Sequence, residues 1–141
     1  MHQVSLDDLR QLLDPLDTAP VECDGMTRLV YTVLAREQIE ASVFVGQLTV
    51  GGRSVAPHYW AEVGQYRIDY RARMWLGLDA SVPHGVYRKA DTIAQYHGEQ
   101  IDIAPLSEAL FEALATPWAS ELMGYKEVCG ADKSLNIKGM S

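Results

Sequence analysis

Three residues that can do chemistry together, a cysteine, a histidine and an aspartate, occur in the order Cys23, His58 and Asp69. A cysteine is a strong nucleophile only as the thiolate, and both a helix N-terminus and a nearby imidazolium stabilise that anion. A carboxylate bound to the far ring nitrogen of the histidine would hold the ring in one tautomer and one orientation. The three residue types therefore predict nucleophilic acyl chemistry on a thiol.

The local sequence around each of these residues predicts the element that positions it. Cys23 comes directly before an amphipathic run with apolar residues at helical spacing, which predicts a helix over residues 24–37. His58 begins a strand-like stretch that ends at Val63, and Asp69 lies in the next such stretch. The thiol is thus expected at a helix N-terminus, and its two partners on adjacent strands.

The two strands are expected to form a hairpin that turns at Gly64-Gln65. This turn sets Glu62 opposite Arg67 as a cross-strand ion pair, and it places His58 and Asp69 on one face as diagonal neighbours. Only a slip of the register by an odd number of residues would separate them. The opposite face is expected to face the core, and it carries Tyr59, Ala61, Val63, Tyr66, Ile68, Tyr70 and Met74.

This order of elements resembles the transglutaminase-like superfamily of papain-related Cys-His-Asp enzymes. The usual strand motif of the family reads His-Ala-Trp-Val-Glu-Val, and this chain has His58-Tyr59-Trp60-Ala61-Glu62-Val63. The resemblance covers about residues 20–75 and implies that Cys23, His58 and Asp69 form the catalytic triad. The chain departs from the family pattern in two segments: Gln38-Ile39-Glu40-Ala41 replaces Gly-Ile-Pro-Ala, and Tyr70 replaces a proline.

The resemblance implies an α+β fold in which the helix bearing the cysteine packs on a small antiparallel sheet bearing the histidine and the aspartate. The implied activity is hydrolysis of a peptide, isopeptide or other amide bond through an acyl-enzyme, with no cofactor. Two alternatives stay open. Acyl transfer to an amine would use the same triad, whereas a non-catalytic binding module would keep only the fold.

Three further residues are candidates for binding the substrate or its oxyanion. Gln47 is a polar residue in an otherwise apolar strand and could add an oxyanion donor to the main-chain N–H of Cys23. Trp60 is expected to pack against the site and to shield the histidine–aspartate pair from water. Arg71 would lie opposite His58 if the strand continues, where its guanidinium could hold an anionic substrate group. The competing interpretation of Arg71 is a solvated basic edge.

Length and composition limit the class of protein. The 141 residues fit a single domain, and the net charge of −7 disfavours nucleic acid or an anionic membrane as the main partner. The two cysteines, Cys23 and Cys129, form no Cys-x-x-Cys pair, so neither a disulfide framework nor a metal site is expected. With no apolar run of membrane length and no signal-peptide pattern at the start, a cytoplasmic location is expected, although signal-independent export would leave no trace. The expected partner is a peptide or amide substrate, and the oligomeric state is not predicted.

The rest of the chain predicts a coarse order of elements from caps, periodicity and turn residues. The expected elements are a helix capped by Ser5 and ending at Leu13, a strand over 41–50, a loop over 75–84, a turn at His97-Gly98, a strand over 100–103, a helix over 105–114 and a frayed end over 132–141.

Overall fold

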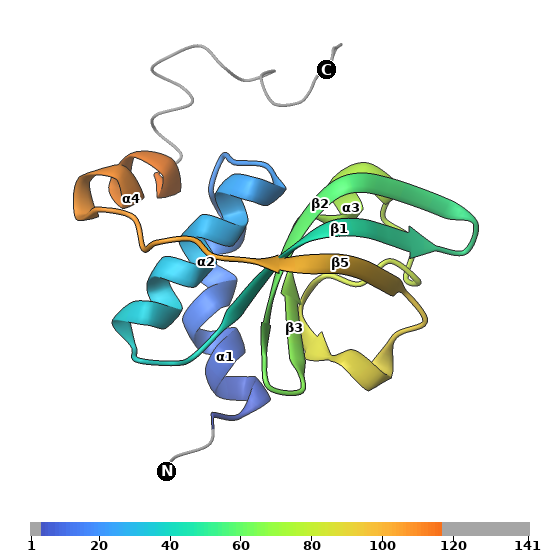
Figure 1. Ribbon diagram of the computed structural model, residues 1–141, viewed down its shortest axis with the longest axis horizontal. Helices are drawn as coiled ribbons and strands as arrows, with labels where there is room; N and C mark the ends of the chain where they lie inside the picture. The colour runs from blue at the N-terminus through green and yellow to red at the C-terminus, as the bar shows by residue number, and fades with distance from the viewer. Residues whose placement is uncertain (1–3, 117–141) are drawn as a thin grey trace.

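The computed structural model describes residues 4–116, which form an α+β fold with one five-stranded antiparallel sheet (Figure 1). The strand order across the sheet is β4-β3-β2-β1-β5. The helices and strands of this part are α1 (Leu6–Leu13), α2 (Cys23–Arg36), β1 (Ser42–Val50), β2 (Arg53–Val63), β3 (Tyr66–Asp69), α3 (Ala72–Leu76), β4 (Gly85–Arg88), β5 (Gln95–Ile101) and α4 (Glu108–Ala115), with 3-10 turns η1 (Asp14–Thr18) and η2 (Lys89–Asp91). Expectations for Cys129 and for residues 132–141 lie outside the described range.

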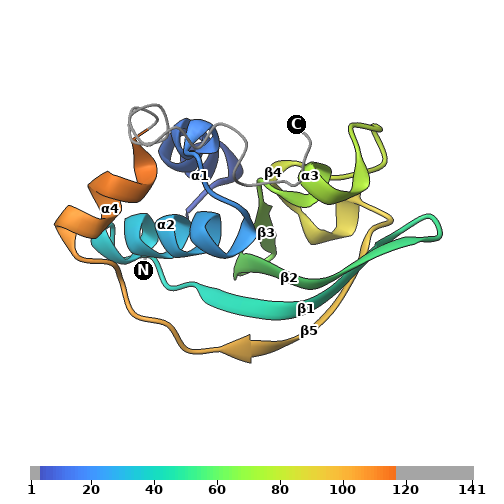
Figure 2. The same cartoon turned by 90° about the horizontal axis from the view of Figure 1, so that it is seen from above.

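The sheet is bent, and helices cover it unequally. Viewed from above, β2, β1 and β5 curve past α2, while α3 lies toward the other end of these strands (Figure 2). Helix α2 packs on β2, α1 packs on β4, and α4 packs on α2. Within residues 4–116, no helix combines the length and apolar character needed to cross a membrane.

The first two helices begin within one residue of their predicted starts. Ser5 caps α1 in a capping box, in which its Oγ accepts the N–H of Asp8 at 3.1 Å and its own N–H donates to the Asp8 carboxylate at 3.4 Å. Helix α2 begins at Cys23, one residue earlier than expected, with Glu22 at the N-cap. The thiol-bearing residue is therefore the first residue of the helix, where main-chain N–H groups lack partners within the helix.

The hairpin of β2 and β3 has the expected register. Glu62 pairs with Arg67 and Val63 with Tyr66, so the chain turns at Gly64-Gln65. Gly64 has a φ of 56°, a left-handed conformation that glycine adopts at no steric cost. The predicted parity of the two strands, and with it the shared face of His58 and Asp69, is confirmed.

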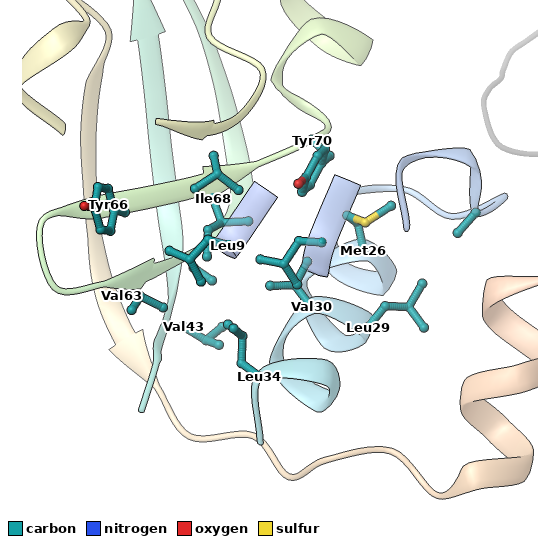
Figure 3. Packing of buried hydrophobic residues seen from close by; sticks show 14 of the residues in the cluster. Leu9, Met26, Leu29, Val30, Leu34, Val43, Val63, Tyr66, Ile68 and Tyr70 are labelled. Carbon is teal, nitrogen blue, oxygen red and sulfur yellow. The ribbon is translucent and has the colours of Figure 1, made fainter. Parts of the chain in front are cut away.

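The apolar face of the hairpin packs against the helices as expected (Figure 3). The labelled members of this cluster are Leu9, Met26, Leu29, Val30, Leu34, Val43, Val63, Tyr66, Ile68 and Tyr70. Met74 was expected in this set, but it is 45% exposed. The reason is that β3 ends at Asp69 and the chain turns into α3, which takes Met74 off the strand face.

In the second half of the chain, an expected loop and an expected helix are present with shifted bounds, and one expected turn is wrong. Part of the expected loop over 75–84 is helix α3, whose Ala72 and Leu76 enter a second apolar cluster with Leu48 and Val82. The helix expected over 105–114 begins later, at Glu108, after a Ser107 cap.

The expected turn at His97-Gly98 lies inside β5. Gly98 pairs with Gly46 of β1, and a Cβ on Gly98 would lie 2.5 Å from the Val45 carbonyl oxygen and 2.8 Å from Cη2 of Trp60. The glycine is therefore required by a close approach between strands and an indole ring, not by a change in chain direction.

Candidate active site

The structure brings the predicted nucleophile, base and orienting carboxylate together from three elements. Cys23 begins α2, His58 lies in β2, and Asp69 is the last residue of β3. All three are buried: Cys23 is 7% exposed, His58 0% and Asp69 3%. The face that the sequence predicts as reactive is thus closed to solvent in this structure.

His58 and Asp69 form a short, buried ion pair when the imidazole is protonated. Nε2 of His58 lies 2.7 Å from Oδ2 of Asp69, and the two side chains are 0% and 1% exposed. With Nε2–H donating to the carboxylate, Nδ1 is left for a second partner. Nδ1 is also the one buried side-chain nitrogen or oxygen within residues 4–116 that has no hydrogen-bond partner.

Cys23 contributes to the raised pKa of His58. Burial alone would lower the pKa of His58, but its contacts with Asp69 and then with Cys23 raise that pKa from 6.5 to about 9. Nε2 is bound by Asp69, and Nδ1 has no hydrogen-bond partner. A histidine held by a carboxylate and lying near a thiol is the arrangement in which a cysteine can be activated as a nucleophile.

The carboxylate of Asp69 receives two further donors that the sequence did not predict. Tyr96 of β5 donates its hydroxyl to Oδ2 at 2.7 Å, and the main-chain N–H of Arg71 donates to Oδ1 at 3.0 Å. Tyr96 was missed because its segment was interpreted as a turn followed by a later strand. Had the strand been extended through Gly98, its parity would have placed Tyr96, Gly98 and Gln100 on one face.

Trp60 packs where the sequence predicts, against the histidine. Its ring is stacked on His58 with a centroid distance of 6.3 Å and on Phe44 at 5.7 Å, and it is 2% exposed. The indole Nε1–H donates to Glu62 at 3.1 Å, so burial leaves its donor satisfied. A wall of this kind excludes water from the histidine–aspartate pair.

Arg71 does not lie on a solvated edge, and the strand that was to place it opposite His58 ends before it. Its guanidinium is buried and donates to the Asp17 carboxylate at 2.8 Å, to the carbonyl of Val21 at 2.7 Å and to that of Ala19 at 2.9 Å. These groups belong to the segment that leads into α2. Arg71 therefore ties the end of β3 to the chain that delivers the thiol.

Gln47 lies apart from these contacts. It is exposed, it pairs with His97 of β5, and it occupies the irregularity in the β1–β2 register between Gly46 and Leu48. Among residues 4–116 its side chain makes no hydrogen bond to Cys23 or His58. The main-chain N–H of Cys23, at the start of the helix, is the better-placed candidate for an oxyanion donor.

The site is tightly packed. Between α2 and the strands β2 and β3, the space beside Cys23, Tyr59 and Arg71 has no room for a water molecule. In the part of the chain that the structure describes, no group of three or more His, Cys, Asp or Glu side chains is arranged to hold a metal ion.

No family model, curated protein or solved structure matches the chain. The function is accordingly inferred from the residues themselves and from their geometry.

Proposed function

We propose that the protein is a cysteine-nucleophile hydrolase of peptide, isopeptide or other amide bonds, with a transglutaminase-like core and Cys23, His58 and Asp69 as its triad. The observation that carries the proposal is the two-sided placement of His58. One ring nitrogen is bound by a buried carboxylate at 2.7 Å, the other has no hydrogen-bond partner, and Cys23 is near enough to contribute to the raised pKa of the imidazole.

The geometry supports a two-step mechanism. The Cys23 thiolate attacks the carbonyl carbon, and the main-chain N–H of Cys23 stabilises the oxyanion. The C–N bond then breaks as His58 gives its proton to the leaving amine, which leaves a thioester on Cys23. His58 next takes a proton from water, which attacks the thioester, breaks the C–S bond and releases the acid, so that the Cys23 thiolate and protonated His58 are restored. Asp69 keeps His58 in one orientation throughout.

The acceptor of the acyl group is tested directly by adding a primary amine. If the enzyme only hydrolyses, the product is the same with and without the added amine. An acyltransferase would instead convert the thioester on Cys23 into an amide of the added amine. We favour water as the acceptor, because hydrolysis needs no second binding site.

One observation favours a different class, a non-catalytic module that keeps the fold. The imidazole of His58 is completely buried, and the space between α2 and the core face of β2 and β3, on one side of Cys23, has no room for a water molecule. A hydrolase would have to open this site to admit a substrate carbonyl, and a binding module would not.

Acylation of the thiol distinguishes these classes. The test uses a Cys129→Ser chain, in which Cys23 is the single cysteine, incubated with p-nitrophenyl acetate and followed by intact mass. We expect one acetyl group on Cys23, released on further incubation, and no such adduct in Cys129→Ser chains that also carry Cys23→Ala or His58→Gln. A folded chain that never gains the acetyl group contradicts the hydrolase and supports the binding module.

A further inference from the structure

Tyr96 lies on the edge strand β5, and its side chain reaches Asp69 on β3. Strand β5, which bears Tyr96, is separated from β3 by both β1 and β2, so the two residues are three strand spacings apart along the sheet. In a flat sheet this is about 14 Å, which is further than a tyrosine side chain spans. The hydrogen bond of 2.7 Å between them exists because the sheet bends around the site.

The hydroxyl of Tyr96 shares an acceptor with the imidazole. Oδ2 of Asp69 receives both the Tyr96 hydroxyl and Nε2 of His58, each at 2.7 Å. A donor on a carboxylate oxygen withdraws part of its negative charge, so the two donors compete for the same anion. The strength of the contact between Asp69 and His58 thus depends on Tyr96.

Tyr96 is itself held in place by its neighbours. The hydroxyl of Tyr87 donates to that of Tyr96 at 2.9 Å. The guanidinium of Arg67 lies 4.1 Å from the centre of the Tyr96 ring, and the ring of Trp60 meets it edge-on at 4.8 Å. A phenol fixed on both its ring and its hydroxyl cannot easily turn away from Asp69.

The hydroxyl of Tyr96 is also always a donor. Burial raises the pKa of Tyr96, and the negative charge of Asp69 raises it further. Burial likewise raises the pKa of Tyr87, to about 12. Both phenols therefore remain protonated over the working range of an enzyme. The His58–Asp69 pair is surrounded by titratable and charged groups from several elements. These groups are Cys23, Glu62, Arg67, Arg71, Tyr87 and Tyr96.

We infer that Tyr96 is a positioning residue for the candidate reaction: its hydroxyl holds the Asp69 carboxylate toward His58 and sets how strongly that carboxylate retains the proton of the imidazole. This inference rests on the proposed function of Cys23, His58 and Asp69. Tyr87 acts on Asp69 through Tyr96, because the hydrogen bond that it donates makes the Tyr96 hydroxyl a stronger donor.

The test is the titration of His58 in Tyr96→Phe, followed by NMR of ¹³C-labelled histidine side chains. Without the phenol hydroxyl, Asp69 has one donor fewer and attracts the imidazole proton more strongly. We expect the midpoint for His58 to move upward by about one pH unit. The rate of Cys23 acylation by p-nitrophenyl acetate is expected to fall about tenfold, because the carboxylate is less well oriented.

Two variants make the test specific. Tyr87→Phe should shift the His58 midpoint in the same direction by a smaller amount, and it serves as the readout if Tyr96→Phe does not fold. Tyr31→Phe removes a phenol hydroxyl from α2, outside this set of contacts, and should leave both the midpoint and the rate unchanged.

The outcomes separate the two proposals. If Cys23 of the otherwise unchanged chain acylates, but neither Tyr96→Phe nor Tyr87→Phe moves the His58 midpoint, the inference about Tyr96 is overturned and the hydrolase stands. If Cys23 never acylates, the proposed function fails and the role of Tyr96 in the reaction fails with it, whereas a shifted midpoint then still shows control of the Asp69–His58 contact.

Discussion

Both faces of the hairpin formed by β2 and β3 are buried, but they are stabilised in different ways. The face toward α2 carries Ala61 and Ile68, whose burial is favourable against any well-fitting apolar neighbour. The opposite face carries His58 and Asp69, whose burial is favourable only where each polar atom finds a partner of the right kind. The same two strands thus combine a non-directional core with a directional polar cluster.

The difference shows where this protein is sensitive to change. Ile68 and Asp69 are adjacent in the chain and both nearly inaccessible, at 2% and 3% exposure. Altering Ile68 should lower the stability and leave the chemistry of Cys23 intact, whereas altering Asp69 should chiefly impair the chemistry. Four changes test and sharpen this contrast.

Asp69→Asn, a change on the polar face, is expected to have the largest effect, and this effect is on the rate of Cys23 acylation. An amide at this position favours the wrong tautomer of His58, so acylation of Cys23 should fall by about 10³- to 10⁴-fold. The measurement is the rate of p-nitrophenol release by the Cys129→Ser chain, with circular dichroism to show that the fold is kept. An unchanged rate would remove Asp69 from the triad.

Arg71→Met tests the connection between the hairpin and the segment before Cys23. The change leaves the carbonyls of Ala19 and Val21 without their donor, and it should lower the free energy of unfolding by about 4 kcal/mol. Urea unfolding measures the loss, and Arg28→Met, at an exposed position of α2, is the matched control. Equal stability of the two variants would contradict the structural role. A raised Michaelis constant for anionic substrates alone would restore the expectation of a substrate anchor.

Ile68→Ala tests the apolar face. Removing three buried carbon atoms should lower the free energy of unfolding by about 3 kcal/mol, and Ile68→Val by about 1 kcal/mol. The pH dependence of Cys23 acylation should remain that of the unmodified chain, measured below the unfolding temperature of the variant. A displaced pH profile would show that the two faces are coupled and would break the contrast.

The pH dependence of stability tests the polar face without any change to the sequence. Because the pKa of His58 is raised from 6.5 to about 9, its contribution to stability is fully present below pH 6.5 and is lost as the pH rises through about 9. Melting temperatures between pH 6 and 10 measure this loss, with His58→Gln as the control. A slope that is the same in both chains would show that His58 is not protonated in the folded state.

Much of the fold follows from local pattern. The N-cap at Ser5, the strand before Gly51-Gly52 and the register of the hairpin were all predicted, because each depends on residues close together in the chain. The second half was predicted poorly. Gly98 is the clearest case, since it was interpreted as a turn residue although its lack of a side chain is needed by Trp60, far away in the sequence.

By itself, the sequence determined that Cys23 begins a helix and that His58 and Asp69 share one face of a hairpin, because side-chain direction in helices and strands follows fixed periods. Only the tertiary structure decided that Tyr96 shares an acceptor with His58, that Arg71 is buried against the segment before Cys23, and that the site is closed. These contacts depend on how far a sheet bends and on where a strand ends. Both depend on how distant segments pack against one another, and the spacing of residues along one segment does not encode this packing.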